Sequence, residues 1–198
     1  MSRMTGHLHT DDARGSKRKL TYQDFVLFPD DGRRHELING EHYVTPTPNT
    51  RHQRLSMRLT ESLLDYLKHH PIGELFSAPF DCVMSPFDVV EPDLLLVTSD
   101  QASLLTDKHV RGAPALVVEI FSPSTRRRDR QLKRELYDRA GVREYWMVDP
   151  TTATITVFRR DVAGYFCEVA TLYASAGDSL TAPLLPGFAL LLQVFFRD

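Results

Sequence analysis

Cysteines and long apolar runs are scarce in this chain of 198 residues. The two cysteines, Cys82 and Cys167, lie far apart and form no CxxC pair or Cys/His cluster. This excludes a zinc ribbon and a disulfide scaffold, and it is typical of a reducing, cytoplasmic environment. No apolar run approaches the ~18 residues that a membrane-spanning helix needs, and Met1–Lys19 has no apolar stretch that could act as a signal peptide. We therefore expect a cytoplasmic protein with no membrane partner.

Net charge is also small, because 24 Lys+Arg residues against 26 Asp+Glu residues give −2 at pH 7. This balance argues against a protein that coats nucleic acid through bulk charge, but it is compatible with a local basic patch. The chain also lacks a glycine-rich phosphate loop and a nucleophile-elbow pattern. Its 42% hydrophobic and 25% charged residues are typical of a globular chain. We expect a flexible tail over residues 1–19 and a single domain over 20–198.

Turn and periodicity signals divide the chain into helices and strands. Asn39-Gly40, the favoured dipeptide of a type I′ turn, predicts a β-hairpin from the flanking segments. Leucines at four-residue spacing from Leu55 to Leu67 predict an amphipathic helix over 51–69, with Thr50 and Gln53 as its capping box. Other expected elements are helices at 22–28 and 128–140, an irregular or edge strand at 75–84, buried strands at 89–97, 115–120 and 144–148, a hairpin at 153–174 and an apolar segment at 184–196. This order predicts an α/β (α+β) domain in which helices flank a mixed central β-sheet.

Two carboxylates interrupt the most apolar strands of this predicted sheet. Asp93 lies at the entry to Leu94–Val97, and Glu119 lies near the end of Leu116–Ile120. A buried, unpaired carboxylate costs several kcal/mol, so each acid needs a partner or a metal ion. If the strands are neighbours, the two acids converge on one hard cation such as Mg²⁺. The alternative is a pair of strand-end carboxylates that cap backbone groups or pair with arginines, and the two acids alone leave both interpretations open.

Longer motifs around these acids carry a family resemblance. Pro92-Asp93 followed by Glu119-x-Phe121 is similar to the PD-(D/E)xK nuclease signature, with Phe121 where that signature has Lys. The stretches ELINGE (36–41), VEIFSPST (118–125) and GVREYWMVDP (141–150) follow in family order and spacing, with Asp129, Lys133 and Tyr137 between the last two. From about Leu20 to the C-terminus, the chain resembles a large bacterial family of restriction-endonuclease-like proteins of the Uma type.

The resemblance implies a restriction-endonuclease-like core that binds Mg²⁺ or Mn²⁺ and hydrolyses a DNA phosphodiester bond. By position, Asp93 and Glu119 match the metal-binding acids, and Lys133 matches a lysine that replaces the one missing at Phe121. Glu36 matches an acid of the opening hairpin, as a ligand or as a group that supports one. The bound ion would polarise the scissile phosphate, and Lys133 would orient the attacking water or balance charge in the transition state.

Helical spacing adds an expectation for Lys133 itself. It shares a helix face with Leu136, Tyr137 and Ala140, which predicts an inward-pointing ammonium with Glu119 as its acidic partner. The alternative is a lysine that snorkels to the surface. On the first interpretation, Lys133→Met should abolish cleavage while leaving metal affinity and the folded state largely intact.

Basic side chains gather at the start of the same predicted helix. Arg126, Arg127, Arg128 and Arg130 predict contacts to DNA phosphates, and the alternative is an ordinary solvated surface. His52 lies on the apolar face of the preceding helix, which favours a packed, hydrogen-bonded histidine over a catalytic one.

Two classes of function remain. The first is a metal-dependent DNA endonuclease, which we expect to be a homodimer because cutting two strands calls for two sites. The second is a catalytically weak or inactive nucleic-acid-binding or scaffold protein that retains the fold. Because Asp93, Glu119 and Lys133 occur together, the sequence favours the endonuclease.

Overall fold

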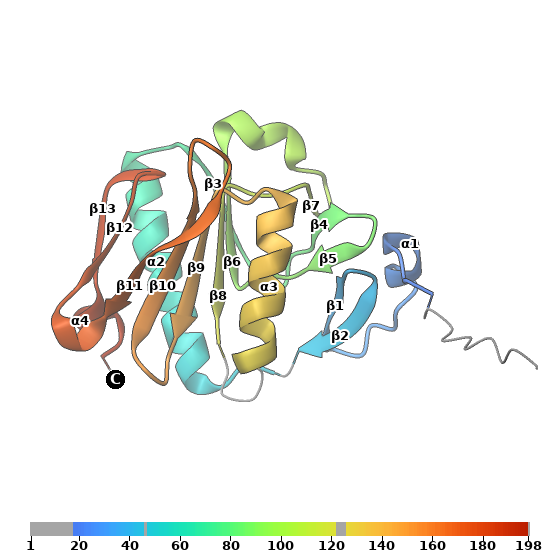
Figure 1. Ribbon diagram of the computed structural model, residues 1–198, viewed down its shortest axis with the longest axis horizontal. Helices are drawn as coiled ribbons and strands as arrows, with labels where there is room; N and C mark the ends of the chain where they lie inside the picture. Colours follow the sequence, from blue (N-terminus) through green and yellow to red (C-terminus); the bar gives the residue numbers. More distant parts are fainter. Residues whose placement is uncertain (1–17, 46, 122–125, 198) are drawn as a thin grey trace, which may run out of the picture.

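Two β-sheets and two long helices make up most of the protein, whose structure is a computed structural model (Figure 1). The described residues are 18–45, 47–121 and 126–197, and residues 126–129 are described by their backbone alone. The tail expected over residues 1–19 therefore lies almost wholly outside the described residues. Within the described ranges, no helix is both long and apolar enough to cross a membrane.

The larger sheet has six strands in the order β11-β10-β9-β8-β6-β3. β8 and β9 run parallel, whereas the other neighbours run antiparallel, which confirms the expected mixed sheet. Its strands are β3 (Gly73–Ser77), β6 (Leu94–Thr98), β8 (Leu116–Ile120), β9 (Glu144–Asp149), β10 (Thr154–Arg160) and β11 (Phe166–Tyr173). The central strands β6, β8 and β9 are buried along their whole length, because both faces of the sheet are covered.

A long helix covers each face of this sheet, as the order of elements predicts. One helix packs Leu55, Leu59 and Leu63 against one face, and the other packs Leu136 and Tyr137 against the opposite face. In Figure 1 the second helix lies in front of the sheet and the first lies behind it. The covering elements are α2 (Thr50–His69), α3 (Arg126–Ala140), the C-terminal hairpin of β12 (Ser179–Ala182) and β13 (Leu185–Leu191), and the short α4 (Leu192–Phe195).

A second sheet of five strands, in the order β2-β1-β5-β4-β7, is not foreseen by the sequence analysis. It contains the predicted hairpin, in which Asn39 and Gly40 have φ angles of 55° and 75°, as the type I′ turn requires. Its strands are β1 (Arg34–Ile38), β2 (Glu41–Thr45), β4 (Cys82–Ser85), β5 (Asp88–Val90) and β7 (Val110–Arg111). The remaining elements are α1 (Tyr22–Phe25) and the 3₁₀ turns η1 (Ser99–Leu104) and η2 (Ala174–Ala176).

The prediction of one strand at 89–97 is wrong, whereas the prediction of an irregular or edge strand at 75–84 is confirmed, since β3 lies at a sheet edge. The apolar run 89–97 is divided at Pro92 into β5 and β6, and the segment 75–84 is divided near Pro79 into β3 and β4. In both cases the two halves belong to different sheets, because a proline nitrogen has no hydrogen to donate to a strand ladder. The two crossings lie side by side, since the Ala78 N–H donates to the Asp93 carbonyl at 3.2 Å.

The start of α2 also differs from the prediction. Asn49 is the N-cap, and its side chain accepts a hydrogen bond from the His52 backbone N–H at 2.9 Å. Thr50 is already helical, so the predicted capping box from Thr50 to Gln53 is wrong. Asn is at least as good an N-cap as Thr, and it fixes the turn of α2 that carries His52.

Candidate active site

The two predicted acids lie at the point where the chain enters the six-stranded sheet. Asp93 immediately precedes β6, and Glu119 lies on β8, its antiparallel neighbour. The side chain of Asp93 reaches across to β8, where its Oδ2 accepts a hydrogen bond from the Ile120 backbone N–H at 2.8 Å. Both carboxylates are buried. The structure therefore brings Asp93 and Glu119 together on neighbouring strands.

Lys133 reaches the same place from α3. Its Nζ donates to Glu119 Oε1 at 3.0 Å and to Glu36 Oε1 at 2.5 Å, so one ammonium joins the two sheets. Glu36 lies on β1 and is buried, like Lys133. The inward orientation agrees with the spacing argument, and the snorkelling alternative is wrong. All four residues singled out for catalysis, Asp93, Glu119, Lys133 and Glu36, lie in one buried cluster.

Tyr137 is a second hydrogen-bond donor to Glu119. Its hydroxyl donates to the same Oε1 atom that accepts from Lys133. The spacing i, i+4 on α3 places both donors on one helix face. Burial, followed by the negative charge of Glu119, raises the pKa of Tyr137, so the hydroxyl keeps its proton and remains a donor.

Asp93 has its own set of donors. Arg34, at the start of β1, donates from one terminal guanidinium nitrogen to Asp93 Oδ1 at 3.0 Å and from the other to the Glu91 carbonyl. His52 Nε2 lies 3.0 Å from Asp93 Oδ2. Burial opposes the charged form, but the hydrogen bond and charge of His52, together with Arg34, hold the pKa of Asp93 below its usual value. An ionised carboxylate only accepts hydrogen bonds, so His52 carries a proton on Nε2.

The cluster contains more carboxylates than permanent cations. Its acids are Glu36, Glu91, Asp93 and Glu119, whereas the cations are Arg34 and Lys133. Burial raises the pKa of Glu119 to about 7, with Asp93 and Glu36 adding to the effect and Lys133 opposing it. The charge of this cluster is compensated only in part, which favours a further cation.

The donor set fits a hard divalent cation. In the part of the chain that the structure describes, no group of three His, Cys, Asp or Glu side chains is arranged to hold a metal ion. Mg²⁺, however, usually keeps several waters and takes only one or two carboxylates from the protein. Among the described residues, Lys133 and Tyr137 both donate to Oε1 of Glu119, whereas both oxygens of Asp93 accept hydrogen bonds. Asp93 and Glu119 would therefore hold such an ion by their carboxylates.

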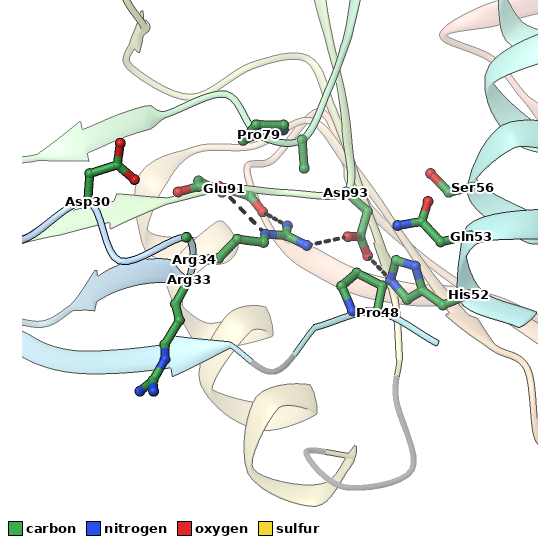
Figure 2. Close-up of a pocket in the computed structure, with 12 residues that line it drawn as sticks. Asp30, Arg33, Arg34, Pro48, His52, Gln53, Ser56, Pro79, Glu91 and Asp93 are labelled. Carbon is green, nitrogen blue, oxygen red and sulfur yellow. Dashed lines mark hydrogen bonds and ion pairs between the residues drawn. The ribbon is translucent and has the colours of Figure 1, made fainter. Parts of the chain in front are cut away.

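A cavity of about 440 Å³ opens beside Asp93 (Figure 2). Its wall includes Arg34, Asp93 and Glu91, and the first turns of α2 contribute His52, with Gln53 and Ser56. Lys133 and Glu119 are not among the residues that line this cavity. The cavity therefore gives access to the Asp93 side of the cluster.

The predicted DNA-binding arginines are only partly described. The side chains of Arg126, Arg127 and Arg128 lie outside the described residues, although their backbone begins α3. Arg130, one turn further on, is exposed. The predicted histidine His52 is buried and hydrogen-bonded, as its position on the apolar face of α2 indicates.

The sequence analysis did not assign three residues of the cluster, Arg34, Glu91 and Tyr137, to the site. Arg34 stands two residues before Glu36, on the same face of β1, and this period-two spacing was a usable signal. Tyr137 was named only as part of the family motif and of the inward face of its helix. It is fully buried, but nothing in the sequence alone indicates which acid its hydroxyl meets.

Comparisons with known proteins agree with this fold. The sequence model of the Uma2 family, described as "Putative restriction endonuclease", matches residues 22–194. A crystal structure described as "a putative nuclease belonging to DUF820 from Anabaena variabilis ATCC 29413" superposes with a TM-score of 0.75 at 18% sequence identity, covering 89% of this chain and 97% of that chain. A search of curated proteins gives no match. At this identity, the structural likeness establishes the fold alone.

Proposed function

This chain belongs to the Uma2 family, and from that premise we propose that it is a metal-dependent endonuclease that hydrolyses DNA phosphodiester bonds. The observation that carries the proposal is the buried Lys133 ammonium, which joins Glu119 to Glu36 beside Asp93. A buried ion-pair network of this size is poor support for stability, because apolar residues of similar volume often stabilise a fold as well or better. A catalytic role would explain why the charged side chains of this network are buried.

Each residue of the cluster has a role in this proposal. Asp93 and Glu119 hold Mg²⁺ or Mn²⁺, which when bound lowers the pKa of a water and stabilises charge on the phosphate. Lys133 fixes the carboxylate of Glu119 and supplies positive charge where the transition state gains negative charge. Glu36 holds Lys133 from the other sheet. The lysine comes from α3 because Phe121, which follows Glu119 by two residues, is buried in the core.

DNA binding forms the second part of the proposal. Arg126, Arg127, Arg128 and Arg130 contact backbone phosphates from the start of α3, next to the cluster. We also propose a homodimer, because cleavage of both strands of a duplex needs two sites.

The proposal is tested by incubating the purified protein with supercoiled plasmid in Mg²⁺, in Mn²⁺ and in EDTA. We expect nicked or linear DNA with either metal ion and intact plasmid with EDTA. Asp93→Asn and Glu119→Gln should each abolish cleavage, because each removes a charged ligand while preserving shape. Asp65→Asn is the matched control, since Asp65 is an exposed acid on α2 whose side chain retains 69% exposure.

Cleavage that persists in EDTA would contradict metal dependence, and equal cleavage by the parent and Asp93→Asn would contradict the site. A parent protein that binds DNA but leaves it intact under all three conditions would favour the alternative class, a binding or scaffold protein that retains the fold. Light scattering gives the molar mass of the free protein and of the DNA complex, and a mass of two chains would support the proposed homodimer.

A further inference from the structure

Arg34 is the residue of the cluster that faces both the acids and open space. It pairs with Asp93 at 3.0 Å and with Glu91 at 3.6 Å, and it also lines the cavity of about 440 Å³. Figure 2 shows its guanidinium between Asp93 and Glu91 at the wall of this cavity. The side chain is 18% exposed, so its charge is held at the boundary between the buried network and the cavity.

The guanidinium does not use all of its donors in this position. One terminal nitrogen donates to Asp93 and the other to the Glu91 carbonyl, whereas Nε faces Glu91 Oε2 at 3.6 Å, just beyond hydrogen-bond distance. The two terminal nitrogens carry four N–H groups between them, and these two hydrogen bonds use only two of them. Arginine presents five N–H donors in a planar fork that matches two oxygens of a phosphate. The present contacts leave part of that capacity unused.

The surroundings of the cavity fit an anionic group with Arg34 as its anchor. The N-terminal turns of α2, a helix of 20 residues, contribute His52, Gln53 and Ser56 to the wall, and a helix N-terminus carries partial positive charge. The wall contains three acids, Asp30, Glu91 and Asp93, and Arg34 pairs with Glu91 and Asp93.

We propose that the cavity beside Asp93 takes a phosphate group of the DNA backbone, that Arg34 is the residue that binds it, and that in the free protein Arg34 serves as a counter-ion for Asp93. This inference rests on the proposed nuclease function and assigns a substrate contact to it. In the free protein the guanidinium compensates Asp93. When a divalent cation and the substrate are bound, the cation compensates Asp93 and the guanidinium donates to phosphate oxygens.

The two possible roles of Arg34 predict opposite changes in metal affinity. If Arg34 is a counter-ion, Arg34→Met removes one positive charge next to a metal-binding acid, and Mn²⁺ should bind about three- to tenfold more tightly. If Arg34 only orients Asp93 for the metal, its removal should weaken Mn²⁺ binding, as loss of an outer partner of a metal ligand typically does, by about 10–100-fold. Calorimetric titration with Mn²⁺ alone distinguishes these outcomes without any reference to cleavage.

The substrate role is tested with a fluorescein-labelled DNA duplex in Ca²⁺ by anisotropy and, in Mn²⁺, by the rate of cleavage. We expect Arg34→Met to weaken DNA binding and to lower kcat/KM by about 10²-fold or more, and Arg34→Lys to retain part of both. Arg33→Met is the matched control, because Arg33 lines the same cavity but points away from Asp93 in Figure 2 and pairs with Asp31 at 3.7 Å.

The inference would be overturned if Arg34→Met bound Mn²⁺ more weakly than the parent. It would also be overturned if Arg34→Met and Arg33→Met changed DNA binding equally. Circular dichroism and melting of each variant identify a folding defect, and in that case Arg34→Lys, which retains the charge, decides the outcome. A parent protein that never cleaves DNA would overturn the proposed function. The effects of Arg34→Met on Mn²⁺ and DNA affinity would still decide whether Arg34 binds phosphate.

Discussion

At the scale of single residues, Lys133 illustrates how a buried charge links stability to chemistry. Its ammonium separates Glu36 from Glu119, and removal of one partner from a buried ion pair costs about 3–5 kcal/mol. We therefore predict that Lys133→Met loses cleavage and also lowers the free energy of unfolding. This replaces the expectation from sequence that the folded state stays largely intact.

Urea denaturation measures the stability of this variant, and the plasmid assay measures its activity. Lys68→Met is the control, because the Lys68 side chain is 71% exposed and pairs with an exposed acid, Asp65. It should match the parent in both assays. Parental stability in Lys133→Met would contradict the buried contacts, and parental cleavage would remove Lys133 from the mechanism.

The two cysteines should differ sharply in reactivity. Burial raises the pKa of the Cys82 thiol to about 12, so at pH 8 it stays protonated as well as inaccessible, whereas Cys167 is exposed. Because the thiolate is the reactive form, a disulfide reagent such as DTNB should modify one thiol per native chain and two per unfolded chain. Rapid modification of two thiols in the native protein would contradict the burial of Cys82 in the core between the sheets.

At the scale of elements, the hairpin of β1 and β2 depends on a turn glycine that also contacts the N-terminal segment. Gly40 has φ +75°, and a Cβ atom there would lie 2.6 Å from Lys19 Cβ and 3.1 Å from the Leu20 carbonyl oxygen. Gly164 has φ +87° but nothing within 4 Å. Both Ala variants are strained by their positive φ, and Gly40→Ala has a clash in addition.

We predict that Gly40→Ala lowers the melting temperature more than Gly164→Ala does, by an amount equivalent to about 1 kcal/mol or more. Differential scanning calorimetry of both variants measures this. Equal melting temperatures would show that residues 19–20 do not pack on the turn.

Local signals in the sequence predicted elements better than they predicted sheets. The Asn39-Gly40 turn and the leucine spacing of α2 depend on neighbours in the chain, and both elements are found where they were expected. The assignment of strands to two sheets depends on partners that are distant in sequence. Val89–Val90 and Leu94–Val97 look alike because all are buried, and only Pro92 between them indicated a break.

The same contrast between local and long-range signals applies to the residues of the candidate site. Asp93 and Glu119 were identified because acids are conspicuous in apolar strands, and Lys133 because helical spacing places it on an inward face. Arg34 and Tyr137 were missed because polar side chains at a strand start or on an apolar helix face have many ordinary roles. Their contacts with Asp93 and Glu119 are produced by the packing of α3 and β1 against the larger sheet.

At the scale of the whole molecule, the net charge of −2 means that attraction to DNA must come from a local surface. We predict that the logarithm of DNA affinity falls linearly with the logarithm of salt concentration, and that each phosphate-binding arginine lost from α3 reduces the slope by about 0.9. Arg130→Ala tests this by anisotropy in Ca²⁺. Arg143→Ala is the control, since Arg143 pairs with Asp100 at 2.6 Å outside α3. An unchanged slope in Arg130→Ala would exclude Arg130 from the DNA interface.

The position of Lys133 between the sheets also has a consequence for how the site is acquired during folding. Glu36 belongs to the five-stranded sheet, Glu119 belongs to the six-stranded sheet, and the lysine that joins them comes from α3. A chain in which either sheet has formed alone contains only part of the acid cluster. Assembly of the cluster therefore coincides with docking of the two sheets, so that a partly folded chain on the way to the native state would carry the arginines of α3 without an assembled acid cluster.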